Sequence, residues 1–446
     1  MREGPVALAW CVLVAGAAAG CKGGGASPGA DAAATGGLSG TPGGSAAGAG
    51  GLATGAAGAS GAAGATPPPE VTVLPFFPRA VSSGGSVDGL MIVGEDFHDP
   101  SRVLRWTAAG GAVVLSDLSD VAVRALTFDG KTIVGESTSA TGTTRVVLVT
   151  GGVRTTLPPP READTQAAFV GMIDDAHTIA GTAWSSVPVF TSSEAFRWTS
   201  SGGTEGLGFL PGDDASEALA MSPGGEIVVG LSYSLAQRKA RPFIWTDAAG
   251  MAELPAPPGS ALSIPVGVSD LGTVAGTAYQ GSDVSFRTIA ATASQAVIWS
   301  QGAVQVVAGC TGTFAASVAL SENETLLGTC QTGAFVAPAA GAARLLALPP
   351  PPPGYTNADQ SIALAGISAD GNVILGARTL TSLGGTESDL VIWNGATGQV
   401  ERLAPRLIGN PGGVVLTNPT RMTLPRNAAV AFGAADGPAG WLLQLP

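Results

Sequence analysis

Short apolar segments separated by glycine-containing turns recur through residues 71–446. The clearest copy covers residues 218–254: an apolar segment, a Ser-Pro-Gly-Gly turn, an Ile-Val-Val-Gly run ending at Gly230, a polar loop, and a third apolar segment around Trp245. Apolar runs of four to eight residues bounded by such turns are typical of β-strands, and a tight glycine turn between two of them predicts a hairpin. The pattern therefore predicts strands throughout, and no helix is evident.

Eight copies of this unit are visible in the sequence. In each copy the second predicted strand ends with an apolar residue followed by glycine, at Gly94, Gly135, Gly181, Gly230, Gly276, Gly328, Gly376 and Gly433. Six copies carry a tryptophan in the third predicted strand, at Trp106, Trp198, Trp245, Trp299, Trp393 and Trp441. Val149 and Ala337 occupy that place in the second and sixth copies. Self-similarity of this kind predicts a repeat architecture.

A fourth predicted strand follows the third in every copy except the last and often ends in Leu-Pro, as at Leu254 and Pro255. Proline cannot donate to a strand ladder, so this strand belongs at the sheet edge. Four antiparallel strands per copy predict an all-β fold, a β-propeller of four-stranded blades.

The two ends of the repeat region complement each other. The last copy stops without a fourth strand, whereas residues 71–74 resemble a fourth strand that has no blade before it. Pairing of the two would close the ring and remove an exposed edge. We expect eight blades; seven is the alternative if a weak copy, the sixth or the last, is an insertion or cap. A solenoid, the other alternative, would need capping repeats.

The repeated tryptophans have two interpretations. They could be stacking platforms for sugars or cations, but a residue at the same place in nearly every repeat is more often packed between neighbouring units, and we favour packing. Trp184 stands outside the repeat position, in the loop predicted after Gly181, and is a better candidate for an exposed contact.

Residues before the repeats predict export. Residues 1–20 have an apolar core too short to span a bilayer and read as a signal peptide. The end of this segment, Ala18-Ala19-Gly20-Cys21, resembles the lipobox of bacterial lipoproteins, which implies lipidation of Cys21; Ala18 departs from the usual leucine. The alternative is ordinary secretory cleavage. Residues 21–69 are rich in Gly, Ala, Ser and Thr, which predicts a disordered tether. The repeat domain then covers residues 70–446.

Composition and charge limit the kinds of partner that the protein can bind. The chain of 446 residues has only 21 Lys and Arg and a formal net charge of −12. Such a surface repels polyanions, and the sequence has no run of basic residues that would attract them locally. We therefore expect no nucleic-acid binding. We also expect a monomer, with membrane contact only through the N-terminal lipid.

One stretch resembles a known family. The segment Glu194-Ala195-Phe196-Arg197-Trp198 and the following Gly-Gly and Leu-Gly pairs resemble HAF-type extracellular repeats, in which a His-Ala-Phe-x-Trp segment precedes the same pairs. Glu194 replaces the family's histidine. The resemblance is clear only in the third and fourth copies, implies export and repeat architecture, and transfers no catalytic residue.

The residues that could carry chemistry are few. With two histidines, His98 and His177, in different copies, a multi-histidine metal site cannot be built, and we predict no metal, cofactor or catalytic residue. The loop 95–99 could bind a cation or act as acid and base, but such loops are usually solvated. In an oxidising compartment Cys310 and Cys330 are expected to form a disulfide across the sixth copy, with two buried thiols as the alternative.

Loop lengths predict where a ligand would bind. Connections between the second and third strands are long and variable, and in a blade they emerge on the same face as the links between blades, so we place the binding site on that face. The candidates are Asp96, His98, Trp184, Arg238, Lys239, Arg241, Asp283 and Arg287.

Three functions are compatible with these features. The favoured one is a binding scaffold, lipid-anchored in the bacterial envelope, for a protein or polysaccharide partner, with secretion as the alternative localisation. The others are an envelope-assembly lipoprotein and an exported propeller enzyme of the lyase or glycosidase type, which needs convergent carboxylates.

Overall fold

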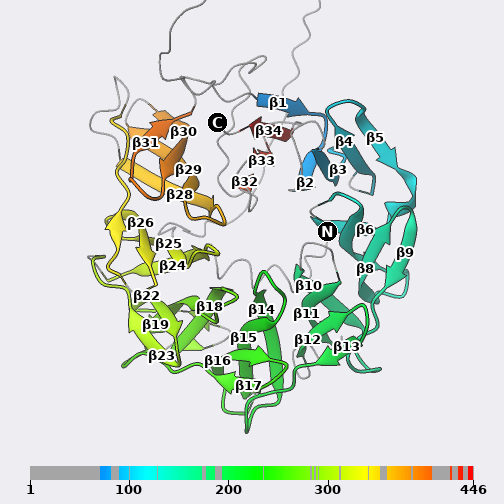
Figure 1. Cartoon of the computed structure of the whole chain (residues 1–446), viewed down its shortest axis with the longest axis horizontal. Coiled ribbons are helices and arrows are strands. Elements are labelled where there is room, and N and C mark those ends of the chain that lie inside the picture. The colour runs from blue at the N-terminus through cyan, green and yellow to red at the C-terminus, as the bar shows by residue number, and fades with distance from the viewer. Residues whose placement is uncertain are drawn as a thin grey trace, which may run out of the picture.

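The computed structural model describes residues 71–81, 90–99, 101–127, 129–172, 177–185, 193–234, 236–281, 284–285, 288–289, 291–310, 313–339, 341–351, 359–382, 385–403, 422–423, 430–434 and 440–444. These residues form eight four-stranded antiparallel sheets and one two-stranded hairpin. Figure 1 shows the sheets in a ring; in every sheet that is built from one contiguous segment, the first strand lies nearest the centre. The predicted all-β propeller is confirmed. The signal peptide, Cys21 and the tether lie outside the described residues.

Seven sheets are each built from consecutive segments of the chain. The first four are β2 (Phe77–Val81), β3 (Met91–Glu95), β4 (Val103–Thr107) and β5 (Gly111–Leu115); β6 (Val121–Leu126), β7 (Thr132–Thr138), β8 (Thr144–Thr150) and β9 (Val153–Thr156); β10 (Gln166–Met172), β11 (Thr178–Trp184), β12 (Glu194–Thr199) and β13 (Gly203–Gly206); β14 (Ala215–Met221), β15 (Ile227–Ser234), β16 (Lys239–Thr246) and β17 (Gly250–Glu253).

The next three sheets continue the same order around the ring. They are β18 (Leu262–Val268), β19 (Val274–Gln280), β22 (Ala293–Ser300) and β23 (Ala303–Val306); β24 (Ala315–Leu320), β25 (Thr325–Cys330), β26 (Gly333–Pro338) and β27 (Arg344–Leu345); β28 (Asp359–Ile367), β29 (Val373–Ser382), β30 (Gly385–Asn394) and β31 (Val400–Arg402). The small hairpin of β20 (Val284–Ser285) and β21 (Thr288–Ile289) stands between β19 and β22, and a short 3-10 turn, η3 (Ser116–Leu118), follows β5.

The remaining sheet joins the two ends of the repeat region. Its order is β1-β34-β33-β32, from β1 (Val71–Leu74), β34 (Gly440–Gln444), β33 (Val430–Ala434) and β32 (Met422–Thr423). Val73 of β1 pairs with Trp441 of β34. The predicted pairing of residues 71–74 with the last copy is therefore confirmed, and β1 supplies the outer strand that the last copy lacks.

The repeated glycine of the second strand lies opposite a β-bulge in the first strand. In the β14–β17 sheet, Ala218 pairs with Gly230 and Ala220 pairs with Val229, so Leu219 is the extra residue. The same one-residue shift occurs in all seven contiguous sheets, where the extra residues are Arg79, Arg124, Val170, Leu219, Val266, Val318 and Ala365. A β-carbon added to Gly230 would lie 1.9 Å from the backbone oxygen of Glu217. Glycine recurs because the bulge brings a backbone oxygen too close for any side chain.

The residue after this glycine bonds to the next sheet in three places. The bonds run from Phe169 N to Glu136 Oε1 (2.9 Å), from Ala218 N to Thr182 Oγ1 (3.0 Å) and from Ser317 N to Thr277 Oγ1 (3.0 Å). Each satisfies a backbone N–H beside the bulge. After β15 the equivalent backbone residue is Pro265, which has no N–H, and its counterpart on β15 is the apolar Leu231. Polar and apolar side chains are thus matched to the backbone of the neighbouring sheet.

The tryptophans of the third strands pack at the seams between sheets. Trp299 and Trp393 are fully buried. Trp299 packs against Ile227 and Val229 of the preceding sheet. Its Nε1 donates to Pro255 O at 2.6 Å, and Trp393 Nε1 donates to Ala347 O at 2.6 Å. The packing interpretation is confirmed for these residues, and the segment after the fourth strand is their hydrogen-bond acceptor.

Candidate functional site

Two arginines occupy equivalent bulge positions on the innermost strands of adjacent sheets. Arg79 lies on β2 and Arg124 on β6, and these two strands are in contact. Arg79 donates from Nη2 and Nε to Glu95 Oε2 at 2.8 and 3.1 Å. Arg124 donates in the same way to Glu136 Oε2 at 2.7 and 3.0 Å. We call these four residues the arginine pair site.

The carboxylates of this site are the anchors and the guanidinium groups are the accessible part. The side chains of Glu95 and Glu136 are 14% and 9% exposed, whereas those of Arg79 and Arg124 are 49% and 42% exposed. The second oxygen of Glu136 accepts the bond from Phe169 N, so this carboxylate is held from two sides. A planar guanidinium fixed in this way can offer its outer edge to a carboxylate or a similar oxyanion.

The other five contiguous sheets have an apolar residue at the bulge, so among the described bulge positions only Arg79 and Arg124, on adjacent sheets, are charged. The apolar bulge residues are Val170, Leu219, Val266, Val318 and Ala365. Sequence reasoning missed the site because it placed Glu95 in the loop 95–99, whereas Glu95 is the last residue of β3, and because nothing in the sequence linked Glu95 to Arg79. The available signal was an arginine shortly before the hairpin turn and a glutamate directly after the repeated glycine, in two successive copies.

The loop after β3 contains the predicted candidates Asp96 and His98, and the structure brings them together. Asp96 Oδ1 accepts the His98 backbone N–H at 2.9 Å, and Arg102 Nη1 donates to Asp96 Oδ2 at 3.0 Å. The His98 N–H, and then Arg102, lower the pKa of Asp96 below its ordinary value despite some desolvation. Asp96 is therefore an anion satisfied within its own loop, which favours a structural role over a proton-transfer role.

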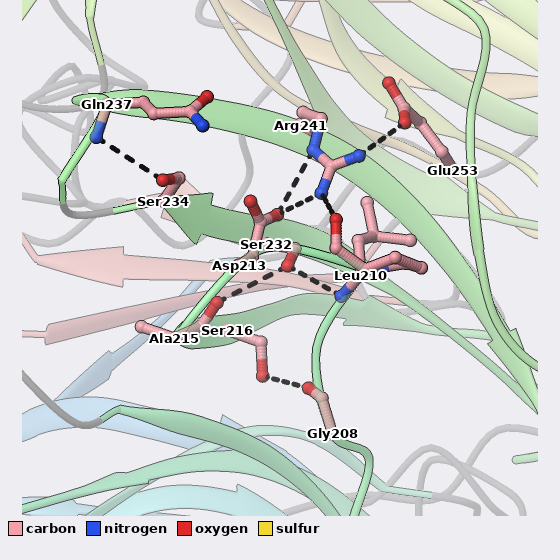
Figure 2. A network of polar contacts seen from close by, with 11 residues as sticks. Gly208, Leu210, Asp213, Ala215, Ser216, Ser232, Ser234, Gln237, Arg241 and Glu253 are labelled. Atoms are coloured by element: carbon pink, nitrogen blue, oxygen red, sulfur yellow. Dashed lines mark hydrogen bonds and ion pairs between the residues drawn. The ribbon is translucent and has the colours of Figure 1, made fainter.

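Arg241, another predicted candidate, bonds to the link before β14 and to the outer strand of its own sheet. Figure 2 shows its guanidinium between the link that precedes β14 and the outer strand β17. Nη2 lies 2.9 Å from Asp213 Oδ2 and donates to Pro211 O at 2.9 Å, while Nη1 donates to Glu253 Oε2 at 2.8 Å. Asp213 is almost fully buried. The ion pair fixes the link between two sheets.

The other candidates lie elsewhere on the ring. Arg238 and Lys239 are exposed at the turn into β16. Trp184 was expected in a loop, but it is the last residue of β11, pairs with Gln166 and is partly buried. The strand extends further than expected because β10 supplies a pairing partner up to that residue. Asp283 and Arg287 lie outside the described residues.

Both described ends of the connection between β11 and β12 lie beside links between sheets. Trp184 O accepts the Thr165 N–H, and Ser193 O accepts the Ser216 N–H. In both cases a residue at one end of the β11–β12 connection accepts a hydrogen bond from a residue at or just before the start of a first strand, β10 or β14.

Cys310 and Cys330 are free cysteines in the structure, so the expected disulfide is not formed there. They belong to one apolar cluster. Burial, followed by the interaction with Cys330, raises the pKa of the Cys310 thiol to about 12. Little thiolate is present at neutral pH with such a pKa, which slows thiol–disulfide chemistry.

A partly buried acid that sequence reasoning missed, Glu217, lies on β14. Tyr233 OH donates to Glu217 Oε2 at 2.8 Å. Burial raises the pKa of Glu217 above its ordinary value of 4.5, and the Tyr233 bond opposes this only in part. A carboxyl with a raised folded pKa stabilises the fold most below its unfolded pKa, and this contribution is lost as pH rises through the folded pKa.

We expect Glu217→Gln to remove this loss of stability with rising pH, because glutamine does not ionise. Its amide oxygen can still accept the Tyr233 bond. The stability of the variant relative to wild type should rise as pH is increased from about 4.5 towards neutrality, as measured by urea unfolding at a series of pH values. Glu205→Gln, at an exposed position on β13, is the matched control and should show no such trend. A pH-independent difference between Glu217→Gln and wild type would contradict the prediction.

In the described part of the chain, no group of three or more His, Cys, Asp or Glu side chains is arranged to hold a metal ion.

No protein-family model and no curated protein matches this chain. Solved structures with a similar arrangement include a prolyl endopeptidase, at 12% identity over 81% of this chain and 54% of the other, with a TM-score of 0.47. This chain thus spans about half of that enzyme. Others are the oligogalacturonate lyase of Vibrio parahaemolyticus (11% identity, 80% and 97% covered, TM-score 0.44) and the β-propeller domain of the Trilobed protease of Pyrococcus furiosus (9%, 76% and 98%, 0.41). These likenesses concern the fold alone.

Proposed function

We propose that this propeller is a binding scaffold that holds carboxylate groups of a protein or polysaccharide partner at the arginine pair site. The observation that carries the proposal is the pair of half-exposed guanidinium groups on adjacent innermost strands, each oriented by a mostly buried glutamate. Charge-assisted bonds from oriented arginines are among the strongest polar contacts available for recognition. Isolated carboxylates fit better than a dense polyanion, because the chain carries a formal net charge of −12.

The sequence supports an envelope location for this scaffold. In the proposal, the signal peptide directs export, lipidation of Cys21 anchors the chain, and residues 21–69 hold the propeller away from the membrane as a monomer. Within the described residues, no helix is long and apolar enough to cross a membrane. The resemblance to HAF-type repeats agrees with this location and remains a prediction.

We propose further that the working form is a closed ring of eight blades. The eighth blade is the sheet of β1 with β32, β33 and β34. Its support is that β33 contacts β2 on one side and β32 contacts β28 on the other. A seven-bladed ring would count only the contiguous sheets and leave this composite sheet as a cap.

The test is binding of the full-length chain to glycans that carry uronic acids and to acidic peptides. Arg79→Gln with Arg124→Gln should weaken binding by about tenfold or more, because each charge-assisted bond contributes roughly 1.5–3 kcal/mol. Carboxyl-reduced glycans, and peptides whose acidic residues are replaced by neutral ones, should bind to wild type as weakly as the carboxylated probes bind to the double variant. Comparing glycans with peptides distinguishes a polysaccharide from a protein partner.

Arg154→Gln provides the matched control. Arg154 is also a partly exposed arginine paired with a carboxylate, Asp120, but it lies on the outermost strand β9. Its substitution should leave binding unchanged. Equal binding by wild type and the double variant, or no binding to any carboxylated probe, would overturn the proposal.

A further inference from the structure

A pocket of about 520 Å³ opens at the seam between the β2–β5 and β6–β9 sheets. Its apolar lining comes from both sheets: Met91, Val114, Leu115, Leu118, Ile133 and Val149. Asp129 and Lys131, which form an exposed ion pair, also line it together with Arg105. The pocket is distinct from the arginine pair site, because Arg79, Glu95, Arg124 and Glu136 are not among its lining residues.

Strand register shows that Val149 occupies the tryptophan position of its sheet. Ile133 of the second strand pairs with Val149 of the third. The equivalent pairs in other sheets are Ile92 with Trp106, Ile179 with Trp198, Val228 with Trp245, Val274 with Trp299 and Ile374 with Trp393. The pocket is thus found at a seam where a smaller side chain replaces the indole ring.

The hydrogen-bond acceptor position of the missing indole also lines the pocket. At the seam of Trp299, the acceptor Pro255 follows Leu254, whose N–H bonds to Pro242 O. Leu115 is the equivalent of Leu254. Leu115 pairs with Val103, three residues before Trp106, and Leu254 bonds to Pro242, three residues before Trp245. Ser116 is therefore the equivalent of Pro255, and it is a lining residue of the pocket.

The other sheet without a tryptophan differs. Ala337 is fully buried, and its cluster includes Phe335, with Val307, Cys310 and Ala343 packed against it. Apolar side chains enclose Ala337 there. Val149 is also packed in an apolar cluster, with Ile133 and Leu118, and is 7% exposed, but it lines an open pocket.

We propose that this pocket binds a small planar aromatic molecule that carries an N–H donor, of the indole class, in the place that tryptophan fills at the other seams. The apolar walls of both sheets would cover the two ring faces, as at the seam of Trp299, and the N–H would point towards the backbone at Ser116. Apolar pockets with one or two placed polar groups are typical of small-molecule sites. The inference does not depend on the proposed carboxylate binding.

The experiment is a titration of the full-length chain with indole, followed by calorimetry and by NMR. We expect saturable binding with a Kd of roughly 0.1–1 mM, in keeping with so small a ligand, and intermolecular NOEs between indole protons and the Val149 methyl groups. N-methylindole, which lacks the donor, should bind at least about threefold more weakly.

Val149→Trp should fill the pocket, abolish indole binding and raise the melting temperature. Val153→Trp is the matched control, because Val153 is in the same sheet, 69% exposed and outside the lining, and it should bind indole as wild type does. The NOE measurement on wild type keeps the test decisive even where Val149→Trp fails to fold. No saturable binding, or NOEs only to residues elsewhere, would overturn the proposal.

Discussion

Gly181→Ala should destabilise the propeller by about 3 kcal/mol or more, the upper part of the range for forcing atoms into a packed interior. An added β-carbon would lie 2.3 Å from the backbone oxygen of Ala168 and 2.5 Å from the Phe196 ring. The oxygen belongs to the bulged first strand and cannot withdraw without disturbing the pairing of β10 with β11. The Phe196 ring is almost fully buried, so it has little space into which to rotate. Urea unfolding, followed by tryptophan fluorescence, measures the change.

Gly202→Ala is the matched control for this prediction. Gly202 lies in the turn between β12 and β13 of the same sheet, where an added β-carbon approaches only the hydroxyl of Thr199, which can rotate. The control should lose less than about 1 kcal/mol, as is usual for exposed positions. Similar losses for the two variants would show that the bulge relaxes and that glycine has another role there.

The repeated glycine shows what can be predicted from the sequence and what cannot. Its spacing predicts where each second strand lies and how many copies exist, because strand pattern and turn chemistry are local properties. Its cause is not local: the oxygen that excludes a side chain at Gly230 belongs to Glu217, on the other side of the hairpin. The bulge that places this oxygen is visible only in the strand register.

The same limit applies to the candidate site. The sequence places the charged candidates Asp96 and Arg241 in variable connections. Arg241 instead lies on β16, because β15 supplies a pairing partner for it, and both residues are satisfied by groups of the protein itself. Arg79 and Arg124 lie on the first strands β2 and β6. Alternation along a strand assigns each side chain to one face of the sheet, but it does not reveal the bulges at these two residues. Their pairing with Glu95 and Glu136 depends on register, which the sequence leaves open.

Trp299→Ala should cost about 3–5 kcal/mol, the usual range when a buried aromatic side chain is truncated. The ring lies in the cluster that joins two sheets, with Leu254 and Val268 among its members. Removing it also leaves Pro255 O without its 2.6 Å hydrogen bond from Nε1. Because both sheets lose packing, the effect should appear in the global unfolding transition, measured by urea denaturation with circular dichroism.

Two further variants separate the contributions to this loss. Trp299→Phe retains an aromatic ring but removes the N–H donor, so it should cost about 1–3 kcal/mol for the unsatisfied carbonyl together with a smaller packing defect. Trp184→Ala, in which a partly exposed tryptophan at the end of β11 is truncated, should cost less than Trp299→Ala. If the two alanine variants lose the same stability, the seam is no more important than a strand end, and the seam tryptophans would again be open to a role in ligand binding.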